Sequence, residues 1–340
     1  MDISTSYMGI KLKNPLIVGA CSLTGSAEKA REIEKAGAGA LVIKSLFEEQ
    51  IQLERFKADE DEMKYNDRQW EMLDIYPLVT HDREYAGTED HMRLVEKICK
   101  TVKIPVFASL NAVNRDAWVE YAKQLSKTGV QGLEVNLYSS PKELDKHGHE
   151  VESEEYKTLH EINKNVSIPI AVKLSPFYTN PLDVISKMDT HGADAFVLFN
   201  RLFQPKIDIR KEQHISPLNL SHEEDSRLPL RFVGLLHGNI KADICASTGI
   251  FHGNQIVEMI LAGANAVQAV SAFYRNGLPH IETMLKDLEN WMESKNYKNL
   301  EDFRGKLDKE NCGNPWAYTR AQYAKLLMNP QEVMDNAPVP

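Results

Sequence analysis

Hydrophobic and polar residues follow two alternating patterns along this chain. Short apolar runs, typical of strands buried on both faces, are separated by segments in which apolar residues recur with helical spacing. Trp118, Tyr121, Ala122 and Leu125, for example, fall on one helical face. The expected strands are eight: Asn14–Val18, Ala40–Ile43, Ile104–Ala108, Leu133–Leu137, Ile168–Val172, Ala195–Phe199, Asp243–Ala246 and Ala266–Val270.

Glycines mark the ends of several helical segments. Gly37, Gly129, Gly192 and Gly263 each stand between a helical pattern and an apolar run. Glycine suits the position after a helix because a positive φ costs it little. Strands that alternate with helices eight times predict an α/β fold, a single (β/α)8 TIM barrel, although the pattern alone leaves an open doubly wound sheet as an alternative.

Three connections are longer than a barrel needs: 46–92, 138–155 and 201–228. Each follows an even-numbered strand, so all three are expected at the C-terminal mouth, where barrel enzymes build their sites. The acidic stretch within the first fits a plain solvated loop equally well. We expect the barrel to span residues 1–307 and a polar tail to occupy 308–340, without chemistry assigned to it.

Composition narrows the class of partner. The net charge is −9, and the basic residues are scattered, which disfavours nucleic acid and anionic membranes and favours a small-molecule substrate. No apolar stretch is long enough to span a membrane, and the N-terminus lacks a signal-peptide pattern, so we expect a cytoplasmic protein. The cysteines, at positions 21, 99, 245 and 312, lack metal-ligand spacing, and no metal site is expected.

Two lysines stand at the ends of buried strands, Lys44 and Lys173. A buried ammonium without a partner costs several kcal/mol, so a lysine there usually meets an anion, unless it reaches solvent at the strand end. Asn111, Asn136 and Asn200 stand at matching strand ends. Their amides suit recognition of a ring with adjacent carbonyl and N–H groups, or they cap the next helix or turn.

The turns after the last two strands are rich in small and hydroxyl residues. Ser247-Thr248-Gly249 follows the seventh strand, and Ser271-Ala272 follows the eighth. Phosphate sites of barrel enzymes often form between these two turns, where small side chains let the backbone approach the anion. A plain helix start is the alternative for either turn.

Several short motifs together resemble the class 1 dihydroorotate dehydrogenases. They are Asn14-Pro15, Lys44-Ser45, Asn136-Leu137, Val172-Lys173-Leu174, Asn200, Thr248-Gly249-Ile250, and the stretch from Leu261 to Ala272. The resemblance runs from about residue 3 to 307. Each motif is loose, but their order and spacing are fairly specific.

The resemblance implies an FMN-dependent oxidoreductase that oxidises dihydroorotate or a similar dihydropyrimidine. It places the phosphate near Thr248, Gly249, Ser271 and Ala272, and Ala20 and Cys21 beside the flavin. It also places Lys44, Ser45, Asn111, Asn136 and Lys173 against the ring system. A cation such as Lys173 near the N1/O2 edge would stabilise the reduced flavin. A homodimer is also implied.

The sequence departs from the family pattern at the substrate. The loop after the fourth strand carries Ser139 and Ser140 where the family has a Cys or Ser base. Ser139 is preferred, Ser140 is the alternative, and a site without a catalytic serine is the third option. The Asn-rich substrate segment has no counterpart in 65–90, and Arg201 follows Asn200. Arg201 could pair with a substrate carboxylate, and Asn136 and Asn200 would contact the ring.

Other interpretations stay open at this point. The departures fit a related FMN enzyme with another substrate, or a flavin-binding protein without turnover. Lys173 could instead form a Schiff base in a flavin-free barrel lyase. The electron acceptor is not inferable, since no dinucleotide-binding fingerprint follows a strand.

Overall fold

The fold is described by a computed structural model. It describes residues 1–47, 88–111, 114–137, 145–202, 204–215, 219–314 and 316–319, with residues 324, 327 and 328. The expected base loop and most of the connection 46–92 therefore lie outside the described residues.

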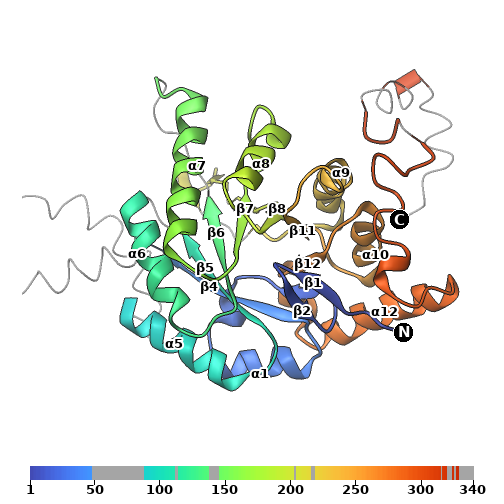
Figure 1. Cartoon of the computed structure of the whole chain (residues 1–340), viewed down its shortest axis with the longest axis horizontal. Helices are drawn as coiled ribbons and strands as arrows, with labels where there is room; N and C mark the ends of the chain where they lie inside the picture. The colour runs from blue at the N-terminus through green and yellow to red at the C-terminus, as the bar shows by residue number, and fades with distance from the viewer. Residues whose placement is uncertain are drawn as a thin grey trace, which may run out of the picture.

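Eight parallel strands close into a barrel (Figure 1). In chain order they are β3 (Leu16–Val18), β4 (Ala40–Phe47), β5 (Val106–Asn111), β6 (Gly132–Leu137), β7 (Ile170–Leu174), β8 (Ala195–Leu198), β11 (Asp243–Ser247) and β12 (Ala266–Ala269). Each pairs with the next, and β12 pairs with β3. The predicted (β/α)8 barrel is confirmed.

Helices form an outer layer around the strands in Figure 1. They are α1 (Ala27–Lys35), α5 (Thr88–Thr101), α6 (Arg115–Ser126), α7 (Gly148–Asn165), α8 (Pro181–Thr190), α9 (Arg227–Leu236), α10 (Gly253–Ala262), α11 (Ser271–Asn276) and α12 (His280–Ser294). Their apolar faces pack on the strands; in α6 the buried residues are the four predicted from spacing, Trp118, Tyr121, Ala122 and Leu125.

A hairpin that the sequence pattern did not predict closes the N-terminal end of the barrel. It consists of β1 (Thr5–Tyr7) and β2 (Ile10–Leu12). The backbone N–H of Met8 donates to the Asp243 carboxylate at 2.7 Å, and the Thr5 hydroxyl donates to the Asn265 carbonyl at 2.9 Å. The hairpin therefore covers the N-terminal end of the barrel in the described part of the chain.

Alternate residues of each strand point into the barrel or out toward the helices. The half of the interior nearer the hairpin is apolar: Ile17, Val42 and Phe107 are fully or almost fully buried in one cluster with the hairpin residue Leu12. Polar side chains take over nearer the mouth, where Glu134 and Lys173 are buried. The interior is therefore apolar near the hairpin and polar near the mouth.

The long connections differ from expectation in their extent. The expected loop 138–155 ends early, because Glu150 in the first turn of α7 bonds back to the backbone of His147 and starts the helix at Gly148. The connection after β8 carries an antiparallel ribbon, β9 (Lys206–Asp208) paired with β10 (Gln213–Ile215), which the sequence did not predict.

The C-terminal segment packs on the barrel beyond residue 307. The Lys309 N–H donates to the Gly234 carbonyl at 2.9 Å, and His237 Nδ1 lies 2.7 Å from the Asp308 carboxylate. Tyr318 lies against Gly234, whereas Trp316 is 61% exposed. Of these two aromatic residues, Tyr318 packs on the barrel and Trp316 is largely exposed.

Candidate active site

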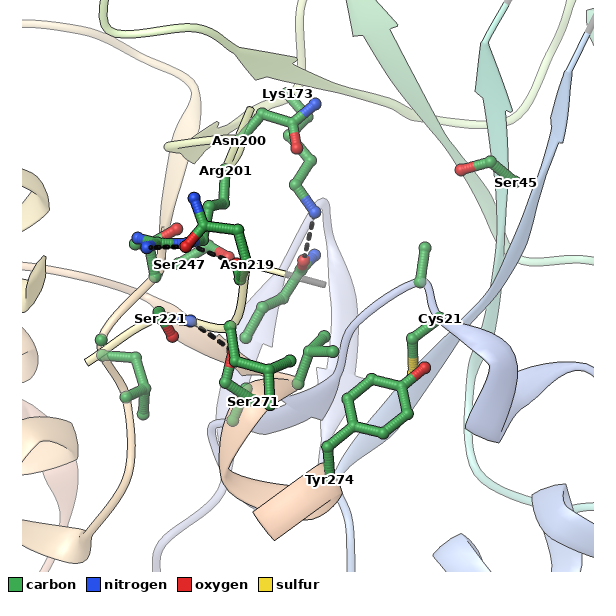
Figure 2. Close-up of a pocket in the computed structure, with 18 of the residues that line it drawn as sticks. Cys21, Ser45, Lys173, Asn200, Arg201, Asn219, Ser221, Ser247, Ser271 and Tyr274 are labelled. Atoms are coloured by element: carbon green, nitrogen blue, oxygen red, sulfur yellow. Dashed lines mark hydrogen bonds between the residues drawn. The ribbon is translucent and has the colours of Figure 1, made fainter. Parts of the chain in front are cut away.

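A cavity of about 300 Å³ opens at the C-terminal ends of the strands. Figure 2 shows side chains from several strands and loops converging on it. Its walls are formed by Ala20, Cys21, Ser22, Lys44, Ser45, Phe47, Lys173, Asn200, Arg201, Asn219, Leu220, Ser221, Ser247, Thr248, Gly249, Ile250, Gln268, Ala269, Val270, Ser271 and Tyr274. Its position at the barrel mouth makes it the candidate active site.

Most residues singled out in the sequence meet at this cavity. Ten of them line it: Ala20, Cys21, Lys44, Ser45, Lys173, Asn200, Arg201, Thr248, Gly249 and Ser271. Three do not line it: Asn111 at the end of β5, the buried Asn136, and the fully buried Ala272. Ser139 and Ser140 lie outside the described residues.

Lys173 forms the floor of the cavity together with two buried side chains. Its ammonium Nζ lies 3.2 Å from Glu134 Oε1 on β6 and 3.2 Å from Gln268 Oε1 on β12. The Gln268 amide also donates to the second oxygen of Glu134. A dashed line in Figure 2 marks the bond from Lys173 to Gln268. The charge of the lysine is therefore balanced beneath the cavity.

A second polar chain supports the adjoining wall. The Asn136 amide donates to the Ser109 hydroxyl at 2.8 Å and to the Leu110 carbonyl at 3.1 Å. Ser109 in turn lies 2.7 Å from the hydroxyl of Ser45, which lines the cavity. Within the described structure, Asn136 therefore acts on the cavity through Ser109 and Ser45.

Lys44 borders the cavity near the start of α5. His91 in the first turn of that helix is buried, and burial, with a smaller effect of the Lys44 charge, lowers the pKa of His91 to about 4. The imidazole is thus neutral at physiological pH. Lys44 therefore lines the cavity on the side of α5.

The turn after β11 lines one side of the cavity. Thr248 and Gly249 both have positive φ, 81° and 80°, and a Cβ on Gly249 would lie 2.2 Å from the backbone nitrogen of Ser226. Only glycine fits there without a backbone shift. The Ser271 hydroxyl accepts the N–H of Ser221 at 2.9 Å, so the loop after β8 is joined to the start of α11.

Arg201 lines the cavity and also holds the loop over it. Its guanidinium bonds the Asn219 carbonyl at 2.8 Å, the Asn219 side chain at 3.0 Å, and the Asp225 carboxylate at 2.6 Å. These bonds use three of the five N–H groups of the guanidinium. The loop that returns from β10 is therefore fixed at the mouth by this residue.

The opposite wall is formed by the turn after β3. Ser22 Oγ lies 2.6 Å from the Tyr274 hydroxyl of α11, which ties this turn to the last βα unit. Burial raises the pKa of the Cys21 thiol, and burial also raises the pKa of Tyr274. Both groups are neutral at physiological pH, which suits a wall against an uncharged ring better than a nucleophile.

Comparison with known proteins places this geometry in a family. The sequence pattern of the family described as "Dihydroorotate dehydrogenase" matches residues 2–292. The chain belongs to the dihydroorotate dehydrogenase family. Members of this family are FMN-dependent oxidoreductases that act on CH–CH bonds, as the resemblance of the sequence motifs predicted.

The curated relatives of this dihydroorotate dehydrogenase family member carry two kinds of name. "Dihydroorotate dehydrogenase B (NAD(+)), catalytic subunit" of Thermoplasma volcanium is 28% identical over 310 residues, 89% of this chain and 98% of the relative. The protein of the same name from Caldicellulosiruptor bescii is 26% identical over 318 residues, 91% and 100%. "Dihydroorotate dehydrogenase A (fumarate)" of Lactobacillus helveticus is 29% identical over 214 residues, 60% and 68%.

The cavity fits the FMN of the family. Its walls carry small and apolar side chains, Ala20, Ile250, Ala269 and Val270, that suit the faces of a flat ring. The turns after β11 and β12 offer hydroxyl groups and backbone N–H groups, which suit a phosphate. The floor offers the Lys173 ammonium, which suits a ring that gains negative charge on reduction.

The sequence analysis did not identify four residues at or beneath the cavity: Glu134, Asn219, Ser221 and Gln268. Gln268 and Glu134 each lie within an apolar strand. Side chains two residues apart in a strand share a face, so Glu134 faces the same side as Asn136, the interior of the barrel. That alternation was a usable signal. Asn219 and Ser221 come from a long loop whose return to the mouth no local pattern reveals.

Proposed function

We propose that this chain oxidises dihydroorotate to orotate in the cavity at the barrel mouth. FMN supplies the acceptor for the hydride that leaves the CH–CH bond. The observation that supports the proposal is the Lys173 ammonium held at a cavity whose walls include the small and apolar residues Ala20, Ile250, Ala269 and Val270. A fixed cation there stabilises the negative charge that grows during hydride transfer.

The residue roles follow from the positions of the side chains. Ala20, Cys21, Lys44 and Ser45 would border the ring system, and Thr248, Gly249 and Ser271 would hold the phosphate. Asn136 and Asn111 would support the ring indirectly, since neither lines the cavity. Ala272 would fix the start of α11 from the buried side.

A proton must leave the substrate as the hydride leaves. Ser139 or Ser140 would accept it, with Ser139 preferred, and Asn200 and Arg201 would bind the substrate. Replacing the base, as Ser139→Ala or Ser140→Ala, should slow flavin reduction by about 10²- to 10⁴-fold, the usual contribution of a general base. Stopped-flow reduction with each variant distinguishes the two serines.

The decisive experiment is an anaerobic titration of the purified protein with dihydroorotate, followed by the visible flavin spectrum. Bleaching at the flavin absorption maximum is the expected result. A protein whose flavin is bleached by dithionite but not by dihydroorotate would contradict the substrate and retain the cofactor.

A related FMN enzyme with a different substrate is the second candidate. Two observations favour it: Arg201 already bonds Asn219 and Asp225, and the Asn-rich segment has no counterpart in 65–90. A panel of dihydropyrimidines without the carboxylate, tested in the same titration, separates the two. A Schiff-base lyase is disfavoured, because Lys173 is paired with Glu134 and a charged ammonium cannot attack a carbonyl.

The electron acceptor and the oligomeric state each need a separate experiment. One relative is named for fumarate and others for NAD(+), so both acceptors should be offered to the reduced protein. Among the described residues, no helix has the length and apolar character to cross a membrane. Fractionation tests the expected cytoplasmic location, and sedimentation tests the expected homodimer.

A further inference from the structure

The floor of the cavity contains a buried carboxylate that the proposed reaction does not use. Glu134 is 2% exposed, and both of its oxygens have partners: Lys173 Nζ at 3.2 Å, and the Gln268 amide. Gln268 bonds Lys173 as well, so the three side chains form a closed ring of hydrogen bonds. In this ring Lys173 only donates, Glu134 only accepts, and Gln268 does both, so the orientation of the Gln268 amide is fixed.

The ring spans the barrel. β6 and β12 are separated by three strands on either side in the closed order, so Glu134 and Gln268 reach each other from opposite walls. Gly19 makes room for it, since a Cβ there would lie 3.2 Å from Gln268 Oε1 and 2.9 Å from Val270. The floor is therefore a built feature that depends on residues from four strands or their ends.

The ring fixes where the charge of Lys173 lies. Two of the three ammonium N–H groups are directed to Glu134 and Gln268, which leaves one for the cavity that Lys173 lines. Gln268 also lines the cavity, whereas Glu134 does not. The positive end of the pair therefore faces the cofactor, and the negative end lies beneath it.

We propose that Glu134 is a positioning residue that sets the reduction potential of the bound FMN by partly neutralising Lys173. A full positive charge at the floor would favour reduced flavin more strongly, and the carboxylate beneath it moderates that effect. The proposal rests on FMN occupying this cavity, as in the proposed function, but on no particular substrate.

The test is the potential of the E134Q holoprotein, measured by equilibration with a reference dye and a chemical reductant. Removing the negative charge should raise the ratio of reduced to oxidised flavin about tenfold at a fixed solution potential, which corresponds to a shift of about +30 mV for a two-electron couple. Because no dihydroorotate is used, a wrong substrate cannot produce or hide this result.

Two further variants make the outcome decisive. E134Q/Q268E moves the carboxylate to the other side of the same ring, so it should return the potential, and any lost FMN retention, toward the wild-type value. E155Q makes the same chemical change at a carboxylate buried on α7 against Tyr178, outside the cavity walls, and should leave the potential unchanged. An E134Q potential equal to or below that of the wild type, or a double variant that behaves like E134Q, would overturn the proposal.

Discussion

At the scale of the residue, the proposed chemistry of the site concentrates on Lys173. The residue is 8% exposed and lines the cavity, and its ammonium is anchored by Glu134 and Gln268. The sequence pointed to it because a lysine ends an otherwise apolar strand. The sequence analysis did not identify Glu134. A single acidic residue in an apolar strand can be assigned to the barrel interior only when the inward-facing positions of that strand are known.

Replacing Lys173 should remove stabilisation of the transition state, and it should also lower the stability of the protein, because the buried Glu134 loses its partner. We expect Lys173→Ala to slow flavin reduction by dihydroorotate about 10²-fold or more, the usual effect of removing a charge-stabilising donor. Stopped-flow spectroscopy on protein with its FMN content measured provides the value. Lys157→Ala, an exposed lysine paired with Glu154 on α7, is the matched control and should keep the wild-type rate.

A second residue-scale prediction concerns Glu155. Burial raises the pKa of this carboxyl from 4.5 to about 7, although the hydroxyl of Tyr178 donates to it at 2.8 Å. The folded state then binds the proton more tightly than the unfolded state, so stability falls as pH rises from about 4.5 to 7. The loss amounts to about 3 kcal/mol.

Glu155→Gln removes this proton from the equilibrium. We expect the variant to unfold at higher urea concentration than the wild type at pH 8 and to differ little from it at pH 4.5, with the same FMN absorbance. Urea titrations at both pH values check the result. Equal stabilisation at both would mean that packing, rather than ionisation of the carboxyl, separates the two proteins.

At the scale of the element, turns after the strands shape the cavity. Gly249 has a φ of 80°, and its Cα lies so near the backbone of Ser226 that a Cβ would stand 2.2 Å from that nitrogen. Gly249→Ala should therefore displace the turn, with a cost of about 1–3 kcal/mol for backbone strain and a loss of FMN affinity. Flavin fluorescence titration and thermal unfolding measure the two effects.

Gly148→Ala is the matched control for that substitution. Gly148 is the first residue of α7, and a Cβ there meets nothing within 4 Å. The change should leave FMN binding intact and stabilise the protein by up to about 1 kcal/mol, because alanine is the better helix residue. Similar losses in both variants would show that glycine content, rather than the turn after β11, controls the cavity.

How well the elements follow from the sequence depends on their length. The barrel strands were located because each joins an apolar run to a glycine or proline, and errors were confined to their ends. β5, for example, begins at Val106 instead of Ile104 because Pro105 donates no ladder hydrogen bond. The two ribbons, β1–β2 and β9–β10, were not predicted, because a strand of three residues is too short to show an alternation of apolar and polar positions.

At the scale of the whole molecule, the packed apolar interior and the candidate active site lie at opposite ends of the barrel. The N-terminal hairpin packs beneath the strands, and Leu12 is fully buried in the lower interior with Ile17 and Phe107. The cavity and the polar floor lie toward the opposite end.

Leu12→Ala should reveal that separation. The cavity it leaves in a packed interior costs about 2–5 kcal/mol, whereas the flavin site, at the other end of the barrel, should keep its absorption spectrum and its potential. Lys11→Ala, at the exposed neighbouring position of the same strand, should change neither property. Urea unfolding gives the stability and dye equilibration the potential. A Leu12→Ala protein with wild-type stability but an altered flavin potential would mean that the hairpin communicates with the mouth rather than simply sealing the barrel.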